Sequence, residues 1–180
     1  MQFDKLTTRA QESLQSAQRI ATEHNHQALE NEHLLVALLD QDDGFVPSVL
    51  RSLGSDPKKI RDDASALVDS LPAVSGSGSQ IYLSSETKET IDAAFDLARE
   101  FHDEYISVEH LFLAMVERKK GHVAELLKRA GITKAAARRQ IESLRGPHRV
   151  TDQDPETKYQ SLAKYAKDLT ELARKESSIP

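Results

Sequence analysis

Two Glu-His pairs are the residues of this chain best suited to chemistry, because a carboxylate beside an imidazole can serve acid-base catalysis or metal binding. The pairs are Glu32-His33 and Glu109-His110. A zinc hydrolase of the H-E-x-x-H type needs a second histidine at i+4, on the same helical face. Here each Glu precedes its His, and no histidine follows at i+4. A first-turn carboxylate also interacts favourably with the helix dipole and free backbone N–H groups, so a structural role explains both pairs.

Other reactive patterns are missing from the sequence. His24 and His26 have a spacing that is weak evidence for a metal site. Neither a Gly-rich phosphate loop nor a G-x-S-x-G nucleophile elbow occurs, and the chain has no cysteine. Its 29 acidic residues leave no carboxylate pair that can be singled out. We therefore expect no catalytic residue, no metal site and no cofactor in this chain, and a binding function.

The acidic balance of the chain bears on its partners. Its 180 residues carry a net charge of -5 at pH 7, whereas nucleic acids and anionic membranes are bound by clustered Lys and Arg. No stretch approaches the roughly 18 apolar residues of a membrane span, and the first residues lack the apolar core of a leader segment. We expect a cytoplasmic protein that binds neither nucleic acid nor membrane.

The elements that position these residues are written twice. A shift of 77 positions places residues 6–8 (LTT) on residues 83–85 (LSS) and residues 32–34 (EHL) on residues 109–111 (EHL). Self-similarity of this kind marks a duplicated structural unit. Apolar residues recur at helical spacing in both copies. The sequence predicts an all-α fold of two tandem four-helix units, with helices over residues 8–23, 32–39, 46–53 and 57–71, then 84–101, 108–116, 123–130 and 134–144.

Linkers are predicted from composition. We expect the first unit over residues 1–72, a Ser/Gly linker over 73–82, the second unit over 83–146 and a mobile, Pro-containing linker over 147–156. Residues 157–180 follow, with a ninth helix to about residue 175 whose apolar stripe needs a partner surface. We expect the two units to pack with pseudo-twofold symmetry and to form a groove at their joint.

The differences between the copies suggest where a ligand binds. The first copy has Gln18, His24, Ala28 and Asn31 where the second has Phe95, Phe101, Tyr105 and Val108. Extra apolar bulk in one copy fills a larger core or forms an exposed patch, and exposed apolar patches often bind partners. Phe101 is expected in the core. The residues predicted to line a partly exposed groove are Tyr82, Ile91, Phe95, Tyr105 and Val108.

Five segments carry a resemblance to a known family: residues 3–7 (FDKLT), 71–76 (LPAVSG), 80–84 (QIYLS), 103–111 (DEYISVEHL) and 164–173 (KYAKDLTELA). With the duplication, they resemble the Clp amino-terminal (Clp N) domain, the helical module at the front of Clp-type AAA+ unfoldases, and its ClpB branch in particular. In that branch the last segment leads into an ATPase domain. The chain therefore resembles an isolated amino-terminal fragment of a protein disaggregase.

The resemblance implies a substrate-binding module. Domains of the ClpB branch help to capture unfolded or aggregated polypeptide through an apolar groove and pass it to the pore of a hexamer that works with the Hsp70 system. ATP and Mg would belong to the full-length homohexamer and not to this fragment, which we expect to be a monomer. Thr7, Asp103 and Glu109 match residues that the family associates with chaperone activity, through either structural support or substrate contact.

Two alternatives remain open. The chain could be an adaptor or phosphoarginine-degron docking domain, as in other Clp branches, in which Thr7 with Glu32 and Ser84 with Glu109 would form two equivalent sites. It could also be a structural cap or an unrecognised enzyme, which would bind no peptide. His110 departs from ClpB relatives that have an apolar residue at this position.

Overall fold

The computed structural model describes residues 3–40, 43–75 and 80–156. The first unit contains α1 (Thr8–Glu23), α2 (Asn31–Leu39), α3 (Phe45–Ser52) and α4 (Pro57–Asp69). The second contains α5 (Ser85–Glu100), α6 (Val108–Glu117), α7 (His122–Arg129) and α8 (Lys134–Arg145). Every helix of the second unit begins 77 residues after its counterpart, so the predicted duplication and helical class are confirmed.

Matching caps explain why the paired helices begin at matching residues. Thr7 and Ser84 are the N-caps of α1 and α5, and their side chains accept hydrogen bonds from the backbone N–H groups of Ala10 and Thr87. Such a bond satisfies one of the free N–H groups of the first turn. After α3 and α7 the chain turns through Gly54 and Gly131 at φ of 80° and 81°, which only glycine adopts at little cost.

Two parallel backbone contacts define the symmetry between the units. β1 (Ala28–Leu29) pairs with β2 (Tyr82–Leu83), which places Leu29 opposite Leu83. An isolated bridge joins Leu6 to Ile106. The shift of 77 exchanges the members of these two pairs, since Leu6 corresponds to Leu83 and Ile106 to Leu29. Each unit therefore contacts the other in the same way, which is the mark of a pseudo-twofold relation, although the short strands were not predicted.

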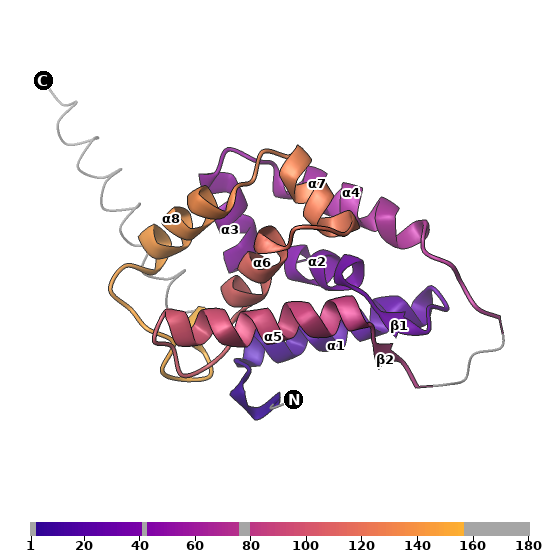
Figure 1. The fold of residues 1–180 in the computed structure, drawn as a ribbon, viewed down its shortest axis with the longest axis horizontal. Coiled ribbons are helices and arrows are strands. Elements are labelled where there is room, and N and C mark those ends of the chain that lie inside the picture. The colour runs from indigo at the N-terminus through magenta and orange to yellow at the C-terminus, as the bar shows by residue number, and fades with distance from the viewer. Residues whose placement is uncertain (1–2, 41–42, 76–79, 157–180) are drawn as a thin grey trace, which may run out of the picture.

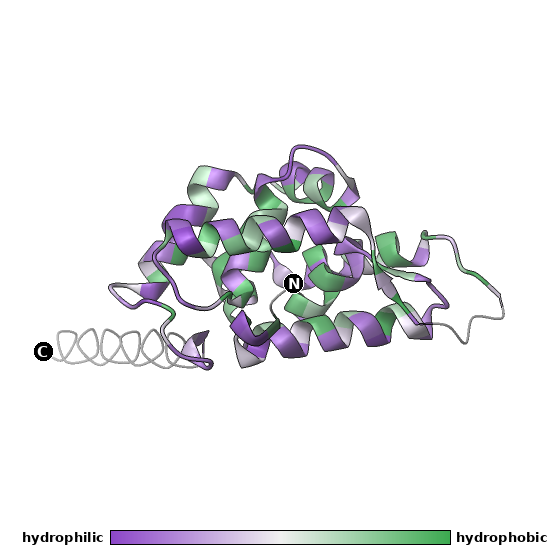
Figure 2. Cartoon of the chain, turned by 60° about the horizontal axis from the view of Figure 1, so that its bottom comes forward, coloured by the Kyte–Doolittle hydropathy of each residue, from purple (hydrophilic) through white to green (hydrophobic). Residues whose placement is uncertain are grey.

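The core lies where the equivalent helices α2 and α6 meet. All nine residues of α2 are buried, as are Val108 to Met115 of α6. The longer helices α1 and α5 lie side by side across them (Figure 1), and hydrophobic and hydrophilic residues alternate along their ribbons (Figure 2). One hydrophobic cluster spans both units. Neither unit has a separate core, which is consistent with the marginal size of a core in one such unit alone.

The predicted linkers are more tightly held than their composition suggests. The N–H group of Val74 donates to the carbonyl of Asn25 at 2.9 Å. Residues 147–156 turn back around the end of α5 (Figure 1), and Val150 and Glu156 are buried. These contacts argue against the predicted mobility of this segment. The predicted ninth helix lies outside the described residues.

Candidate functional site

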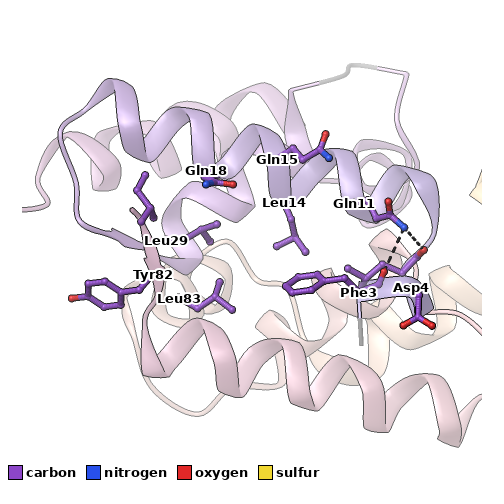
Figure 3. Close-up of a pocket in the computed structure, with 11 residues that line it drawn as sticks. Phe3, Asp4, Gln11, Leu14, Gln15, Gln18, Leu29, Tyr82 and Leu83 are labelled. Atoms are coloured by element: carbon purple, nitrogen blue, oxygen red, sulfur yellow. Dashed lines mark hydrogen bonds between the residues drawn. The ribbon is translucent and has the colours of Figure 1, made fainter. Parts of the chain in front are cut away.

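A groove runs along α1, between this helix and the β1-β2 strand pair. Its volume is about 490 Å³. The short 3-10 helix Phe3–Lys5 closes one end, and Tyr82 stands at the other (Figure 3). The residues that line it are Phe3, Asp4, Leu6, Gln11, Leu14, Gln15, Gln18, Leu29, Ile81, Tyr82 and Leu83.

The lining combines an apolar floor with a polar wall. Leu6, Leu14 and Leu29 are buried at the base. Gln11, Gln15 and Gln18 recur along α1 at helical spacing and bring amide groups to the same groove. The Gln11 Nε2 group donates to the carbonyl of Leu6 at 3.0 Å, which holds the start of the chain against the helix.

Exposed aromatic rings stand at the two ends. Phe3 is 51% exposed and Tyr82 is 60% exposed, and they are the exposed large hydrophobic side chains found in the described part of the chain. Apolar side chains gathered around a concave surface with a few amides mark a ligand site. Asp4 is the one charged residue among the lining residues described. The groove is therefore suited to uncharged, apolar ligand groups.

A single difference between the copies explains why the groove is built on α1. The shift of 77 places Gln18 of α1 on Phe95 of α5, and Leu14 on Ile91. Phe95 packs against the core, and Ile91 is fully buried. The larger ring packs against the core beside α5, whereas Gln18 lines the open groove beside α1. The prediction placed the groove on the side with more apolar bulk, but Ile91 and Val108 of that side are buried, and Phe95 and Tyr105 are half-buried against the core.

Only one of the five residues predicted to line the groove is found among its lining residues. Tyr82 lines the groove, but Ile91, Phe95, Tyr105 and Val108 are not among its lining residues. Ile91 is 0% exposed and Val108 is 7% exposed, so the expectation that they are partly exposed was wrong. Tyr105 is half-buried against the core. The comparison of the two copies missed Phe3, Leu14, Leu29 and the glutamines. The signal that could have located them was Gln18, a polar residue that is smaller than its counterpart Phe95.

Asp103 lies in a buried ion-pair network away from the groove. Its Oδ2 accepts from His110 Nε2 at 2.7 Å, and its Oδ1 accepts from the Arg145 guanidinium at 2.6 Å and the N–H group of Val150 at 2.9 Å. Burial alone would raise the pKa of this carboxyl, but the three donors outweigh it and lower the pKa to about 2. Asp103 is thus a permanently ionised structural anchor at neutral pH.

Thr7 and Glu109 lie at a second buried position, together with Glu156. The Thr7 hydroxyl donates to Glu156 Oε1 at 2.5 Å, and the N–H group of Val108 lies 3.5 Å from the same oxygen. The Ser107 hydroxyl donates to Glu109 Oε1. Glu109 and Glu156 are each 1% exposed. The side chains of Thr7, Asp103 and Glu109 are therefore buried and absent from the groove lining.

The N-cap residues Thr7 and Ser84 join the two units through backbone hydrogen bonds. The N–H group of Thr7 donates to the carbonyl of Ile106, close to Glu109 in the second unit. The N–H group of Ser84 in turn donates to the carbonyl of Leu29, close to Glu32 in the first unit. The pseudo-twofold relation therefore brings the N-cap of each unit to the strand of the other unit, whereas the pairs of the degron-docking alternative, Thr7 with Glu32 and Ser84 with Glu109, stay a prediction. Burial, followed by the charges of Glu30 and Glu86, raises the pKa of Glu32 to about 7.

The first copy has a histidine pair where the second has the Asp103 anchor. His33 Nδ1 accepts from the N–H group of Glu30 at 2.9 Å, so its Nε2 holds the proton and donates to His26 Nδ1 at 2.8 Å. Burial, and then the neighbouring histidines, lowers the pKa of His33 to about 4.

Within the described ranges, no group of three or more His, Cys, Asp or Glu side chains is placed to hold a metal ion. None of the described helices is long and apolar enough to cross a bilayer.

The fold and the duplicated pattern together define a tandem helical domain of the type found in Clp proteins. The sequence pattern of the Clp repeat (R) N-terminal domain matches residues 5–130 and 83–179. The chain belongs to this family.

Curated relatives agree with this assignment. The chain is similar to the chaperone protein ClpB of Clostridium tetani, with 34% identity over 183 residues that cover 100% of this chain and 21% of that protein. It is 42% identical to ClpB of Corynebacterium efficiens over 169 residues, 93% of this chain and 20% of that protein. The chain thus spans about a fifth of the length of these relatives.

Solved structures share the fold at low sequence identity. The Hsp104 N-terminal domain of Candida albicans superposes with a TM-score of 0.75 at 17% identity, covering 84% of this chain and 99% of that domain. A ClpV N-domain in complex with VipB peptide gives a TM-score of 0.63 at 19% identity, with 77% and 86% covered. At this identity the likeness establishes the fold.

Proposed function

We propose that this domain binds exposed apolar segments of unfolded or aggregated polypeptide in the groove along α1. The observation that carries the proposal is the position of Phe3 and Tyr82, whose exposed rings flank the groove. Misfolded chains have exposed hydrophobic side chains in common, whatever their sequence. The leucines would receive such side chains, and the three glutamines would hydrogen-bond the accompanying peptide groups.

Capture of this kind should be weak and reversible. A groove of this size with two aromatic contacts favours a Kd of about 1 to 10 µM, which corresponds to about 7 to 8 kcal/mol. Since Asp4 is the single charge among the described lining residues, binding should depend little on salt. In a longer protein of the ClpB type, a captured segment would pass to an ATP-driven hexamer acting with the Hsp70 system.

Filling the groove tests the proposal. Gln18→Phe gives α1 the residue that α5 has at the equivalent position, Phe95. We expect it to weaken binding of a permanently unfolded, reduced and alkylated protein by about tenfold, or about 1.4 kcal/mol. The measurement is fluorescence anisotropy of the labelled unfolded protein.

Gln140→Phe is the control, because it makes the same change on α8, at a residue that does not line the groove. It should bind like the unchanged chain. Equal affinity for all three proteins, each with an unchanged melting temperature, would rule out the groove as the binding site.

A further inference from the structure

Residues 147–156 return to the body of the domain through backbone and side-chain contacts. The N–H group of Val150 donates to Asp103 Oδ1, and the carbonyl of Val150 accepts from the N–H group of Glu104 at 2.8 Å. The carbonyl of Gln153 accepts from the N–H group of Thr8, also at 2.8 Å. This return segment therefore joins the first turn of α1 to the loop before α6.

The return segment ends at two neighbouring buried carboxyl groups. Glu109 Oε1 and Glu156 Oε1 accept hydrogen bonds from Ser107 and Thr7, respectively. The Oε2 atoms of both glutamates are buried and have no hydrogen-bond partner among the described residues. The two carboxyl groups interact electrostatically, and a proton bound by either of them removes one negative charge from the buried pair.

The surroundings do not supply enough positive charge for two ionised glutamates. Burial, and to a smaller extent Glu156, raises the pKa of Glu109, against the lowering effects of His110 and Arg145. Burial also raises the pKa of Glu156, against its hydrogen bonds from Thr7 and the backbone. Arg145 is already bound to Asp103 at 2.6 Å. The titratable and charged groups around the pair are His110, Arg145, Asp154, Arg9, Glu12 and Asp40.

We propose that Glu109 and Glu156 share one proton and so form a latch that holds the return segment on the α1-α6 face, and that loss of this proton releases the segment. Thr7 and Asp103 act in the latch by binding Glu156 and Val150. These residues then control where the chain leaves the domain, and they act apart from the groove. The latch is independent of polypeptide capture.

The direction of the pH effect follows from proton linkage. In the released state both glutamates are exposed and titrate near the ordinary Glu pKa of about 4.3. Above that pH the released pair loses a proton that the docked pair keeps. Release is therefore favoured by about tenfold for each pH unit, until the docked pair itself ionises. The segment is held most firmly in acid and least firmly in base.

Hydrogen exchange of the full chain measures this equilibrium at single amides. The N–H groups of Thr8, Val108 and Val150 report on it, because each bonds to the return segment or belongs to it. We expect their protection factors, corrected for the pH dependence of intrinsic exchange, to fall by at least about tenfold between pH 5 and pH 8. In Glu156→Gln, a neutral amide replaces the shared proton, so the protection factors should change by less than about twofold over this range.

Glu142→Gln, an exposed change on α8, is the control and should behave like the unchanged chain. Glu109→Gln should remove the pH dependence as Glu156→Gln does. Protection factors that do not depend on pH in the unchanged chain would overturn the latch, as would the same pH dependence in Glu156→Gln. Protection in Glu156→Gln at pH 5 as low as that of the unchanged chain at pH 8 would also overturn the latch, because a neutral group at position 156 would then fail to hold the segment.

Discussion

The two faces beside α1 and α5 come from one repeated unit, yet the first is hollow and the second is filled. At the equivalent positions Gln18 and Phe95, an aromatic ring in one copy packs where the other copy leaves a groove. The pairs around α2 and α6 differ in a similar way, with His26 in the first copy and Asp103 in the second. Duplication preserved the backbone, and single side chains gave the copies different properties.

The buried histidines of the two copies, His33 and His110, have different hydrogen-bond partners. His33 and His110 each accept a hydrogen bond on Nδ1 from the N-cap N–H group of their helix, at 2.9 Å in both copies. Their Nε2 atoms bond to a neutral imidazole in one copy and to a carboxylate in the other. The first pair must stay uncharged to remain buried, whereas the second belongs to an ion-pair network.

The largest effect should come from breaking the network of the second copy. Asp103→Ala leaves Arg145 and His110 buried without their carboxylate partner, and the side chains of all three residues are at most 3% exposed. Removal of one member of a buried ion pair costs about 3 to 5 kcal/mol. We expect a loss of this size in the free energy of unfolding, measured by urea denaturation.

Asp96→Ala provides the comparison for this experiment. Asp96 pairs with Arg99 on the surface of α5, where their side chains are 70% and 77% exposed. Its removal should change stability by less than about 0.5 kcal/mol, since exposed pairs contribute little. A similar effect for the two substitutions would show that the Asp103 network does not hold the second copy together.

The histidine pair of the first copy should have a smaller effect, which is a gradual loss of folding stability as the pH falls. The pKa of His33 is about 4 in the folded chain and about 6.5 in an unfolded chain. The unfolded state therefore binds more protons between these values, so stability falls by up to about 1.4 kcal/mol per pH unit as the pH drops from 6.5 to 4. Below the folded pKa the loss is complete.

His33→Gln tests this origin of the acid sensitivity. The glutamine amide can accept from the N–H group of Glu30 and donate to His26 without gaining charge. The variant should lose less stability than the unchanged chain between pH 6.5 and pH 5, as measured by urea midpoints. His102→Asn is the control, because His102 is exposed at φ of 60°, a conformation that asparagine tolerates. An unaltered pH dependence in His33→Gln would place the acid sensitivity elsewhere.

The helices of this fold could be predicted from the sequence because local signals mark their ends. Thr7, Ser84 and Asp56 are polar caps, and the glycines after α3 and α7 end those helices. The repeat then gave the second unit from the first. Packing between the units could not be predicted in the same way, because Leu29 meets Leu83 only after the two units fold together.

The site was predicted only in part, for the same physical reason. Tyr82 was found, since an aromatic residue next to a Ser/Gly segment has few neighbours along the chain to cover it. Phe95 was predicted to line a partly exposed groove, and it is half-buried against the core, because hydrophobicity alone does not distinguish core from groove. Glu156 was missed altogether, since nothing local indicates that a carboxylate in a charged segment returns to a buried position beside Thr7.

The central claim, that polypeptide binds beside α1 and not beside α5, is tested most directly by amide chemical shifts. The isotope-labelled chain is titrated with the permanently unfolded, reduced and alkylated protein, and then with a phosphoarginine peptide. We predict shifts with the unfolded protein along residues 11–18 and 81–83, which line the groove. Shifts confined to the α5 face around Ile91 and Phe95 would contradict the account. Symmetric shifts near Glu32 and Glu109 with the phosphoarginine peptide alone would replace it with a degron-docking function.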